Sequence, residues 1–205
     1  MVILVSSKFE EIYEMIDSLE GVSPEDKRIL TKLISDEFEE QQALACKDIL
    51  GDWFNRRGLF YQAEVVFSGL ERKVFDCVSV AFIDLDNFKS INDTHGHICG
   101  DKCIAIAANV IRKSIRTIDT YGCLGGDEFV IVFPNASVEV VEMILSRIAE
   151  SFIDADFGFE IGDIELSLTF GIASTDESDD GFISFESLLD LADKRMNANK
   201  FGRSR

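Results

Sequence analysis

The sequence predicts an α/β fold of the α+β kind, in which one sheet is flanked by helices and preceded by a helical extension. Short apolar runs typical of buried strands alternate with segments of helical periodicity from residue 48 onward. The 205 residues are 46% hydrophobic and include only 2 Pro, so they can form a sizeable core. Residues 1–47 show helical periodicity alone, and we expect them to form a separate helical segment.

Segment 1–47 is predicted to contain two helices. A candidate capping box begins at Ser7, and Gly21 ends the first helix. Ser23 is the expected N-cap of the second helix and Pro24 its first residue. The segment either packs on its own domain or provides a dimerising, signal-transmitting seam, and the pattern leaves both open. The apolar stripe of the second helix comprises Leu30, Leu33, Ile34, Phe38, Leu44 and Ala45.

Residues 48–205 are predicted to alternate strands with helices. The glycine pair Gly125-Gly126 indicates a hairpin, and Gly162-Asp163 indicates a second one. The expected strands are Cys77–Asp84, Asp119–Leu124, Glu128–Phe133, Phe157–Ile161 and Ile164–Phe170. The expected helices are Lys102–Ile115, Val138–Phe152 and Phe185–Asn199.

The composition limits the kinds of partner that the protein is expected to bind. With 38 Asp and Glu against 20 Lys and Arg, the formal charge is −18, which argues against polymeric nucleic acid and anionic membranes. A small molecule or another protein is the expected partner. No apolar run approaches the roughly 18–20 residues of a membrane-spanning helix, and the start lacks a signal-peptide pattern. The five cysteines are scattered, so we expect reduced thiols in a cytoplasmic protein and no zinc site at Cys99 and Cys103.

Two acidic groups are the candidates for chemistry. Asp84 and Asp86 lie where a strong strand ends, and Asp127 and Glu128 follow the glycine pair. The group at Asp84 and Asp86, taken alone, could simply be a polar loop that caps the next helix. If the hairpin lies beside the first strand, however, Asp84 and Asp127 would share one or two Mg²⁺ ions, an arrangement suited to phosphoryl transfer.

These residues resemble a known family. The hairpin Gly125-Gly-Asp-Glu-Phe129 resembles the signature of GGDEF domains, the diguanylate cyclases. The stretch from Asp84 to Asp101 resembles their nucleotide-binding segment, Asp48 to Arg57 their opening motif, and Ala192 to Arg203 their closing helix. The resemblance covers 48–205.

The resemblance implies a palm-like nucleotide-cyclase fold with a central, mainly antiparallel sheet. It also implies that a homodimer condenses two GTP into cyclic di-GMP and releases two pyrophosphates. Two Mg²⁺ or Mn²⁺ ions per active site would be held by Asp84, the carbonyl of Leu85 and Asp127. Asp127 would assist deprotonation of the attacking 3′-hydroxyl, and Glu128 would support the metal site.

The resemblance also assigns substrate contacts. Asn92 and Asp101 would read the guanine edge, because a carboxylate accepts hydrogen bonds from guanine that adenine cannot donate. His97 matches a further substrate position. Asn92 and His97 could alternatively cap turns around Gly96.

The phosphate contacts would come from both ends of the domain. Lys89 and the backbone amide of Phe88 would meet the terminal phosphates, and Lys200 and Arg203 resemble distal phosphate clamps. Alternatively, Lys200 and Arg203 are solvated charges that favour the helix dipole.

Arg116, Asp119 and Arg147 resemble the family's inhibitory site, which binds cyclic di-GMP away from catalysis. Arginine suits phosphates and stacks on guanine. The alternative is an exposed salt bridge at a helix end. The spacing to the hairpin favours the inhibitory site.

Two function hypotheses remain open. Cys123 stands where most relatives carry an arginine, and Asn197 replaces a usual aromatic residue. The first hypothesis is an active diguanylate cyclase with a regulatory or dimerising segment at 1–47. The second is a catalytically weak domain that binds GTP or cyclic di-GMP as a receptor or scaffold, because a lost cation near developing charge would slow catalysis.

Overall fold

The computed structural model describes residues 12–177 and 184–203, except for the side chains of 38–44 and 203. The chain divides into two compact units, Met1–Ala45 and Cys46–Arg205. The predicted roles of 1–47 in regulation or dimerisation stay predictions.

The N-terminal unit contains a helix at residues 12–17 and α2 (Pro24–Ala45). Gly21, with φ of 78°, separates them. The predicted N-cap is confirmed, because Ser23 Oγ accepts a hydrogen bond from the Asp26 N–H at 3.1 Å. The apolar side chains of Ile29 and Leu33 are largely exposed. The capping box at Ser7 and the stripe beyond residue 37 lie outside the described residues and side chains.

In the larger unit, the described residues form a six-stranded sheet. Its strand order is β1-β2-β4-β5-β3-β6, and every pairing is antiparallel except the parallel contact between β2 and β4. The predicted central, mainly antiparallel sheet is confirmed. The strands are β1 (Lys47–Asp48), β2 (Gly51–Phe54), β3 (Val78–Asp86), β4 (Thr120–Gly125), β5 (Glu128–Pro134) and β6 (Ser167–Ser174).

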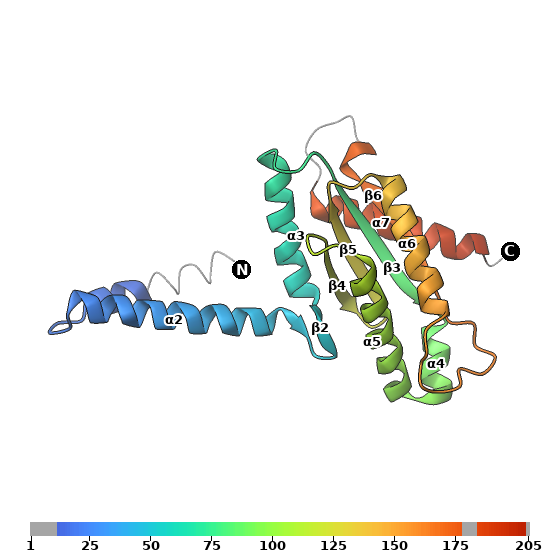
Figure 1. Ribbon diagram of the computed structural model, residues 1–205, viewed down its shortest axis with the longest axis horizontal. Coiled ribbons are helices and arrows are strands. Elements are labelled where there is room, and N and C mark those ends of the chain that lie inside the picture. Colours follow the sequence, from blue (N-terminus) through green and yellow to red (C-terminus); the bar gives the residue numbers. More distant parts are fainter. Residues whose placement is uncertain (1–11, 178–183, 204–205) are drawn as a thin grey trace. The chain divides into compact units, whose positions relative to one another are not determined.

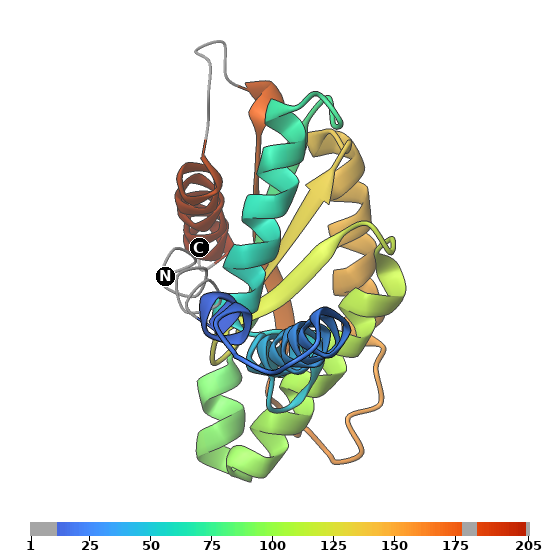
Figure 2. The same ribbon diagram turned by 90° about the vertical axis from the view of Figure 1, so that its left-hand side faces the viewer.

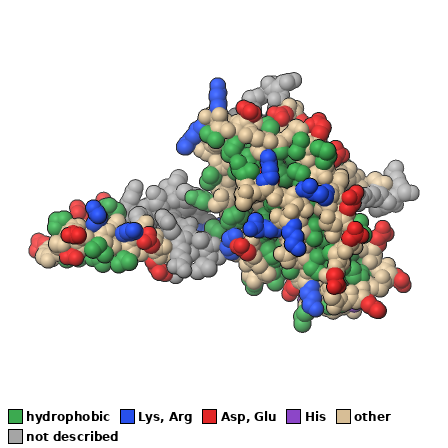
Figure 3. Space-filling model, viewed as in Figure 1, with side chains coloured by type: hydrophobic (Ala, Val, Ile, Leu, Met, Phe, Trp, Pro, Cys, Tyr) green, Lys and Arg blue, Asp and Glu red, His purple; other side chains and the backbone are tan. Residues whose placement is uncertain are grey.

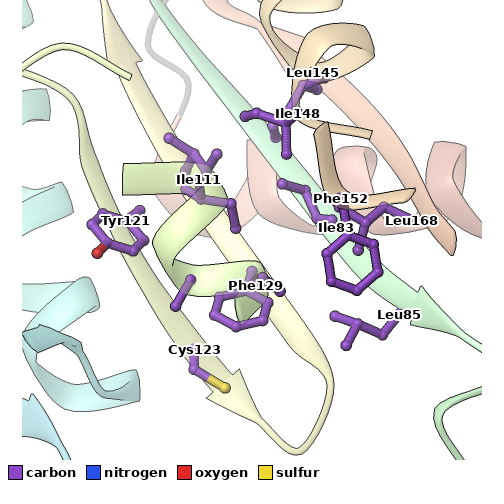
Figure 4. Packing of buried hydrophobic residues seen from close by; sticks show 14 of the residues in the cluster. Ile83, Leu85, Ile111, Tyr121, Cys123, Phe129, Leu145, Ile148, Phe152 and Leu168 are labelled. Atoms are coloured by element: carbon purple, nitrogen blue, oxygen red, sulfur yellow. The ribbon is translucent and has the colours of Figure 1, made fainter. Parts of the chain in front are cut away.

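Helices cover both faces of the sheet, as the two views in Figures 1 and 2 show. One face packs against α5 (His97–Ser114) and α6 (Val138–Ile153), and this core is drawn in Figure 4. The other face packs against α3 (Arg56–Glu71) and α7 (Phe185–Arg203). The short helix α4 (Phe88–His95) follows β3 directly, and a 3₁₀ turn, η1 (Thr175–Glu177), follows β6.

The alternation along β3 determines which face carries its acidic end. Ile83 and Leu85 belong to the core under α5 and α6, whereas Val80 and Phe82 belong to the core under α3 and α7. Because side chains of a strand alternate between faces, Asp84 lies on the α3/α7 face.

The predicted second hairpin is wrong. Residues 157–161 form no strand, and β6 pairs with β3 instead. The alternating aromatic residues pack on helices rather than joining a ladder. Phe157 makes an edge contact with Phe152 of α6, with ring centroids 5.4 Å apart. Phe159 contacts the ring of His95 at the same separation.

Charge is unevenly distributed over the surface of the larger unit. On the face shown in Figure 3, basic side chains lie across the middle and acidic ones mostly along one margin. Within residues 12–177 and 184–203, no helix is both long and apolar enough to cross a membrane.

Candidate active site

The structure brings the two acidic loops together at one corner of the sheet. Asp84 is directly opposite Glu128 in the β3–β5 register. The N–H of Leu85 donates to the carbonyl of Asp127 at 3.2 Å, which attaches the hairpin turn to the end of β3. Two loops distant in sequence therefore place their carboxylates side by side.

The hairpin turn itself is open. Gly126 has φ of 60°, a left-handed conformation that favours glycine. A Cβ at Gly125 or Gly126 would meet no atom within 4 Å. No side chain of the turn therefore separates the acidic pair from an incoming ligand.

The carboxylates raise one another's proton affinity. Burial raises the pKa of Asp84, and the Lys200 ammonium partly offsets this while Asp127 raises it further. Burial, followed by the charges of Asp84 and Asp127, raises the pKa of Glu128. Like charges held this closely are unfavourable, and a bound cation would relieve them.

Lys200 supplies one such cation. Its Nζ donates a hydrogen bond to Asp84 Oδ1, although the two residues are 116 positions apart. The Lys200 ammonium therefore lies at the acidic corner, and its predicted contact with phosphate stays a prediction. Arg203 ends α7, and its side chain lies outside the description.

The start of α4 lies just beyond the acidic corner. Asn87 has φ of 61° and makes no side-chain cap, because its Nδ2 donates to the Glu165 carbonyl at 2.7 Å. The Asn87 carbonyl accepts hydrogen bonds from the N–H groups of Ser90 and Ile91. The first-turn N–H groups of Phe88 and Lys89 have no partner inside the helix, which is the arrangement that binds anions.

The predicted guanine contacts come from the second half of α4 and the first turns of α5. Asn92 Oδ1 is buried and has no hydrogen-bond partner among the described residues. It lies against Gly100, where a Cβ would approach it to 2.0 Å. Asp101, the next residue along α5, is exposed, as is His97. An unpartnered amide oxygen beside an exposed carboxylate can bind a polar ring edge.

Comparison with known proteins identifies the domain. A family model described as "Diguanylate cyclase, GGDEF domain" matches residues 45–205. The chain belongs to the GGDEF family. Diguanylate cyclase DgcP of Pseudomonas aeruginosa is 29% identical over 202 residues, covering 98% of this chain and 28% of that protein. Diguanylate cyclase DosC of Escherichia coli is 33% identical over 165 residues, covering 77% of this chain and 34% of that protein.

The fold agrees with a solved GGDEF structure. The GGDEF domain of DgcB from Caulobacter crescentus, determined in complex with c-di-GMP, has a TM-score of 0.69 at 25% identity. The match covers 77% of this chain and 91% of that one. The chain spans about a third of the length of the curated relatives above.

The second predicted GGDEF site is organised around a buried carboxylate. The side chain of Asp119 is fully buried, and it accepts hydrogen bonds from the Arg116 guanidinium at 2.6 to 3.1 Å and from the Arg116 N–H at 2.7 Å. Arg116 Nη2 also donates to the Pro134 carbonyl, and Arg147 donates to the Ser114 carbonyl at 2.6 Å. Arg116 therefore follows the C-terminal end of α5, and the side chain of Arg147 reaches that end from α6; the Arg116 side chain stays 47% exposed.

Residues that depart from the GGDEF pattern make local contacts. Cys123 is buried beneath the hairpin, and its Sγ donates weakly to the Gly126 carbonyl at 3.6 Å. In the opening motif, the ring of Trp53 lies over Gly51, where a Cβ would be only 2.0 Å from the ring. Asn197 is exposed and bonds within its own helix to Asp193.

Sequence reasoning missed two residues of α7. Asn199 donates to the Phe170 carbonyl at 2.8 Å, and Arg195 donates to the Ile172 carbonyl at 2.6 Å. Their only signal in the sequence is a spacing of four residues, which places both on one helix face.

Proposed function

We propose that this GGDEF domain is a diguanylate cyclase that condenses two GTP into cyclic di-GMP and two pyrophosphates. The observation that supports this best is that Asp84 and Glu128 lie opposite each other in the ladder while the Leu85 N–H bonds to the carbonyl of Asp127, just before the start of α4.

The nucleotide would lie along α4. An eight-residue helix is about 12 Å long, so its two ends can serve different parts of one ligand. The N–H groups of Phe88 and Lys89, with the Lys89 ammonium, would bind the terminal phosphates. Asn92 and Asp101, with His97 nearby, would bind guanine, and the unpartnered Asn92 oxygen would gain a donor.

The acidic corner suits divalent cations. No three Asp, Glu, His or Cys side chains among the described residues form a ready coordinating group. Asp84, the Leu85 carbonyl and Asp127 would instead hold two Mg²⁺ or Mn²⁺ ions together with oxygens of the nucleotide. The ions would neutralise the triphosphate and acidify the attacking hydroxyl. Asp127 would assist deprotonation of the 3′-hydroxyl, and Glu128 would support the metal site. Lys200 and Arg203 would bind phosphate oxygens.

Catalysis would require two copies of the chain. A domain that holds one GTP cannot join two, so the 3′-hydroxyl of one nucleotide must attack the nucleotide on a second domain. The exposed apolar residues of α2, Ile29 and Leu33, supply a surface that would favour pairing.

Cyclic di-GMP would also bind at Arg116 and Arg147 and inhibit the enzyme. Asp119 holds the Arg116 guanidinium by one edge and leaves its exposed side for a phosphate or a guanine face. Asp119 would thus position Arg116. Arg147→Ala is the cleaner test, because its Ser114 contact is exposed. We expect weaker inhibition by cyclic di-GMP with unchanged initial turnover, and inhibition at unchanged potency would refute the assignment.

The activity test is incubation of the purified chain with GTP and Mg²⁺, followed by chromatography over a range of protein concentrations. We expect cyclic di-GMP, and a drop of about 100-fold or more in Asp127→Ala. Asp190→Ala is the control, because Asp190 pairs only with Lys194 at the surface of α7 among the described residues. Unchanged turnover in Asp127→Ala would refute its role. Tight nucleotide binding without product would favour the receptor hypothesis, which Cys123 supports.

A further inference from the structure

The open edge of the sheet is covered by hydrogen bonds from α7. Strand β6 is at the end of the strand order and pairs with β3 on one side only. Carbonyls of alternate residues in an antiparallel edge strand point away from the sheet. Two of these outward carbonyls, those of Phe170 and Ile172, accept hydrogen bonds from Asn199 and Arg195 of α7.

The spacing of these contacts is matched between helix and strand. Arg195 and Asn199 are four residues apart, which is about 6 Å along a helix. Phe170 and Ile172 are two residues apart, which is about 6.8 Å along a strand. The pair therefore aligns α7 with the edge of β6, and Arg195 is itself held by Glu177 at 2.7 Å.

The two bonds differ in how much packing surrounds them. Near Arg195, helix and strand are in close contact, because a Cβ at Gly171 would be 2.2 Å from the Ala192 carbonyl oxygen. Near Asn199 they enclose an open hollow, lined by Thr169, Phe170, Ala198, Asn199 and Gly202. The Asn199 bond thus lies at the wall of this hollow, where it joins the C-terminal part of α7 to the strand.

The residue after Asn199 is Lys200, whose ammonium lies on Asp84. Asp84 is paired with Thr169, the neighbour of Phe170, so the two contacts of α7 reach adjacent positions of the sheet. We infer that Asn199 is a positioning residue that delivers Lys200 to Asp84, where the ammonium competes with a divalent cation for the carboxylate. This inference rests on the metal site of the proposed function.

The test measures Mn²⁺ binding to the full chain without nucleotide, by the electron paramagnetic resonance signal of free Mn²⁺. Lys200→Met is expected to tighten Mn²⁺ binding by up to about fivefold, the upper end of the range for a partly exposed ion pair. Asn199→Ala is expected to tighten it in the same direction, by about two- to threefold. General damage to the site would weaken binding, so tightening separates positioning from a structural role.

Asn197→Ala is the matched control. It makes the same substitution two residues away in the same helix, but Asn197 bonds only to Asp193 among the described residues. We expect it to bind Mn²⁺ as the unaltered chain does. In the double variant Asn199→Ala/Lys200→Met, the effect of Asn199 should vanish.

The inference is overturned if Asn199→Ala matches Asn197→Ala or weakens binding, if the double variant adds the two effects, or if no variant binds Mn²⁺. These outcomes are separate from failure of the proposed function, because no GTP turnover is measured. The Mn²⁺ response can be measured even if the chain makes no cyclic di-GMP.

Discussion

The close contact at Gly171 provides a quantitative test of how α7 is placed. A Cβ at Gly171 would be 2.2 Å from both the Ala192 carbonyl oxygen and the Met196 nitrogen. Both are backbone atoms, so no side-chain rotation relieves the clash. The helix would have to move by about 1.2 Å to reach 3.4 Å, the start of ordinary contact.

We expect Gly171→Ala to destabilise the chain by about 1–3 kcal/mol, the usual cost of overpacking. For a domain of this size, that corresponds to a fall of about 3–10 °C in melting temperature. The assay is thermal unfolding followed by circular dichroism. Lys200 lies on the displaced helix, so turnover should fall as well.

Gly202→Ala is the control on the same helix. A Cβ at Gly202 meets nothing within 4 Å, and alanine favours helix over glycine by about 1 kcal/mol. Its melting temperature should equal or exceed that of the unaltered chain. A melting temperature for Gly171→Ala at or above the unaltered value would show that α7 does not approach β6 as described.

Three further predictions follow from buried or paired groups. Arg116→Ala should lower the free energy of unfolding by about 1–3 kcal/mol, because the buried Asp119 loses its guanidinium donors and keeps only the backbone one, whereas Arg116→Lys should lose less. Denaturant titration measures both variants, and equal stability of Arg116→Ala and the unaltered chain would contradict the prediction. Burial raises the pKa of Cys123 to about 11, so the thiol should react slowly at pH 7.5. Iodoacetamide should leave Cys123 unlabelled in the native chain and label it in denaturant. Labelling of Cys123 in the native chain, read from a peptide map, would refute this. Burial acts to raise the pKa of Glu177, but the hydrogen bonds from Arg195 and the Ser174 N–H, together with the charge of Arg195, outweigh it, and the pKa is lowered. The stabilisation is therefore present above the pKa of Glu177 in the unfolded chain, and it is lost as the pH falls through the pKa in the folded chain. Glu177→Gln should destabilise the chain at pH 7 and have no effect at about pH 2. Unfolding curves at both pH values would check this.

Much of the fold was predictable because its signals are local. The continuous apolar run of β3 and the glycine pair of the hairpin each identify an element within a few residues. The alternation of Phe157, Phe159 and Ile161 is also local, and it led to the wrong prediction of a strand. Period-2 alternation indicates one apolar face, but whether a strand or a helix covers that face depends on the tertiary structure.

The candidate site was predictable only in part. The resemblance located the acidic loops and the nucleotide segment, and the structure shows them adjacent. The contact between Lys200 and Asp84 spans 116 residues, and no periodicity reports such a pairing. Asn199 was missed because its role depends on which strand lies at the edge of the sheet, and the strand order cannot be predicted from a short motif.

Both ends of the sheet are closed to another strand. At one end β1 has only two residues, and at the other two carbonyls of β6, those of Phe170 and Ile172, are already bonded to α7. Two copies of this domain cannot therefore join by merging their sheets into one continuous ladder, the route by which many strand-rich proteins aggregate. Contact between copies has to use helices and loops. Such contacts are reversible, so the association of two domains can be regulated.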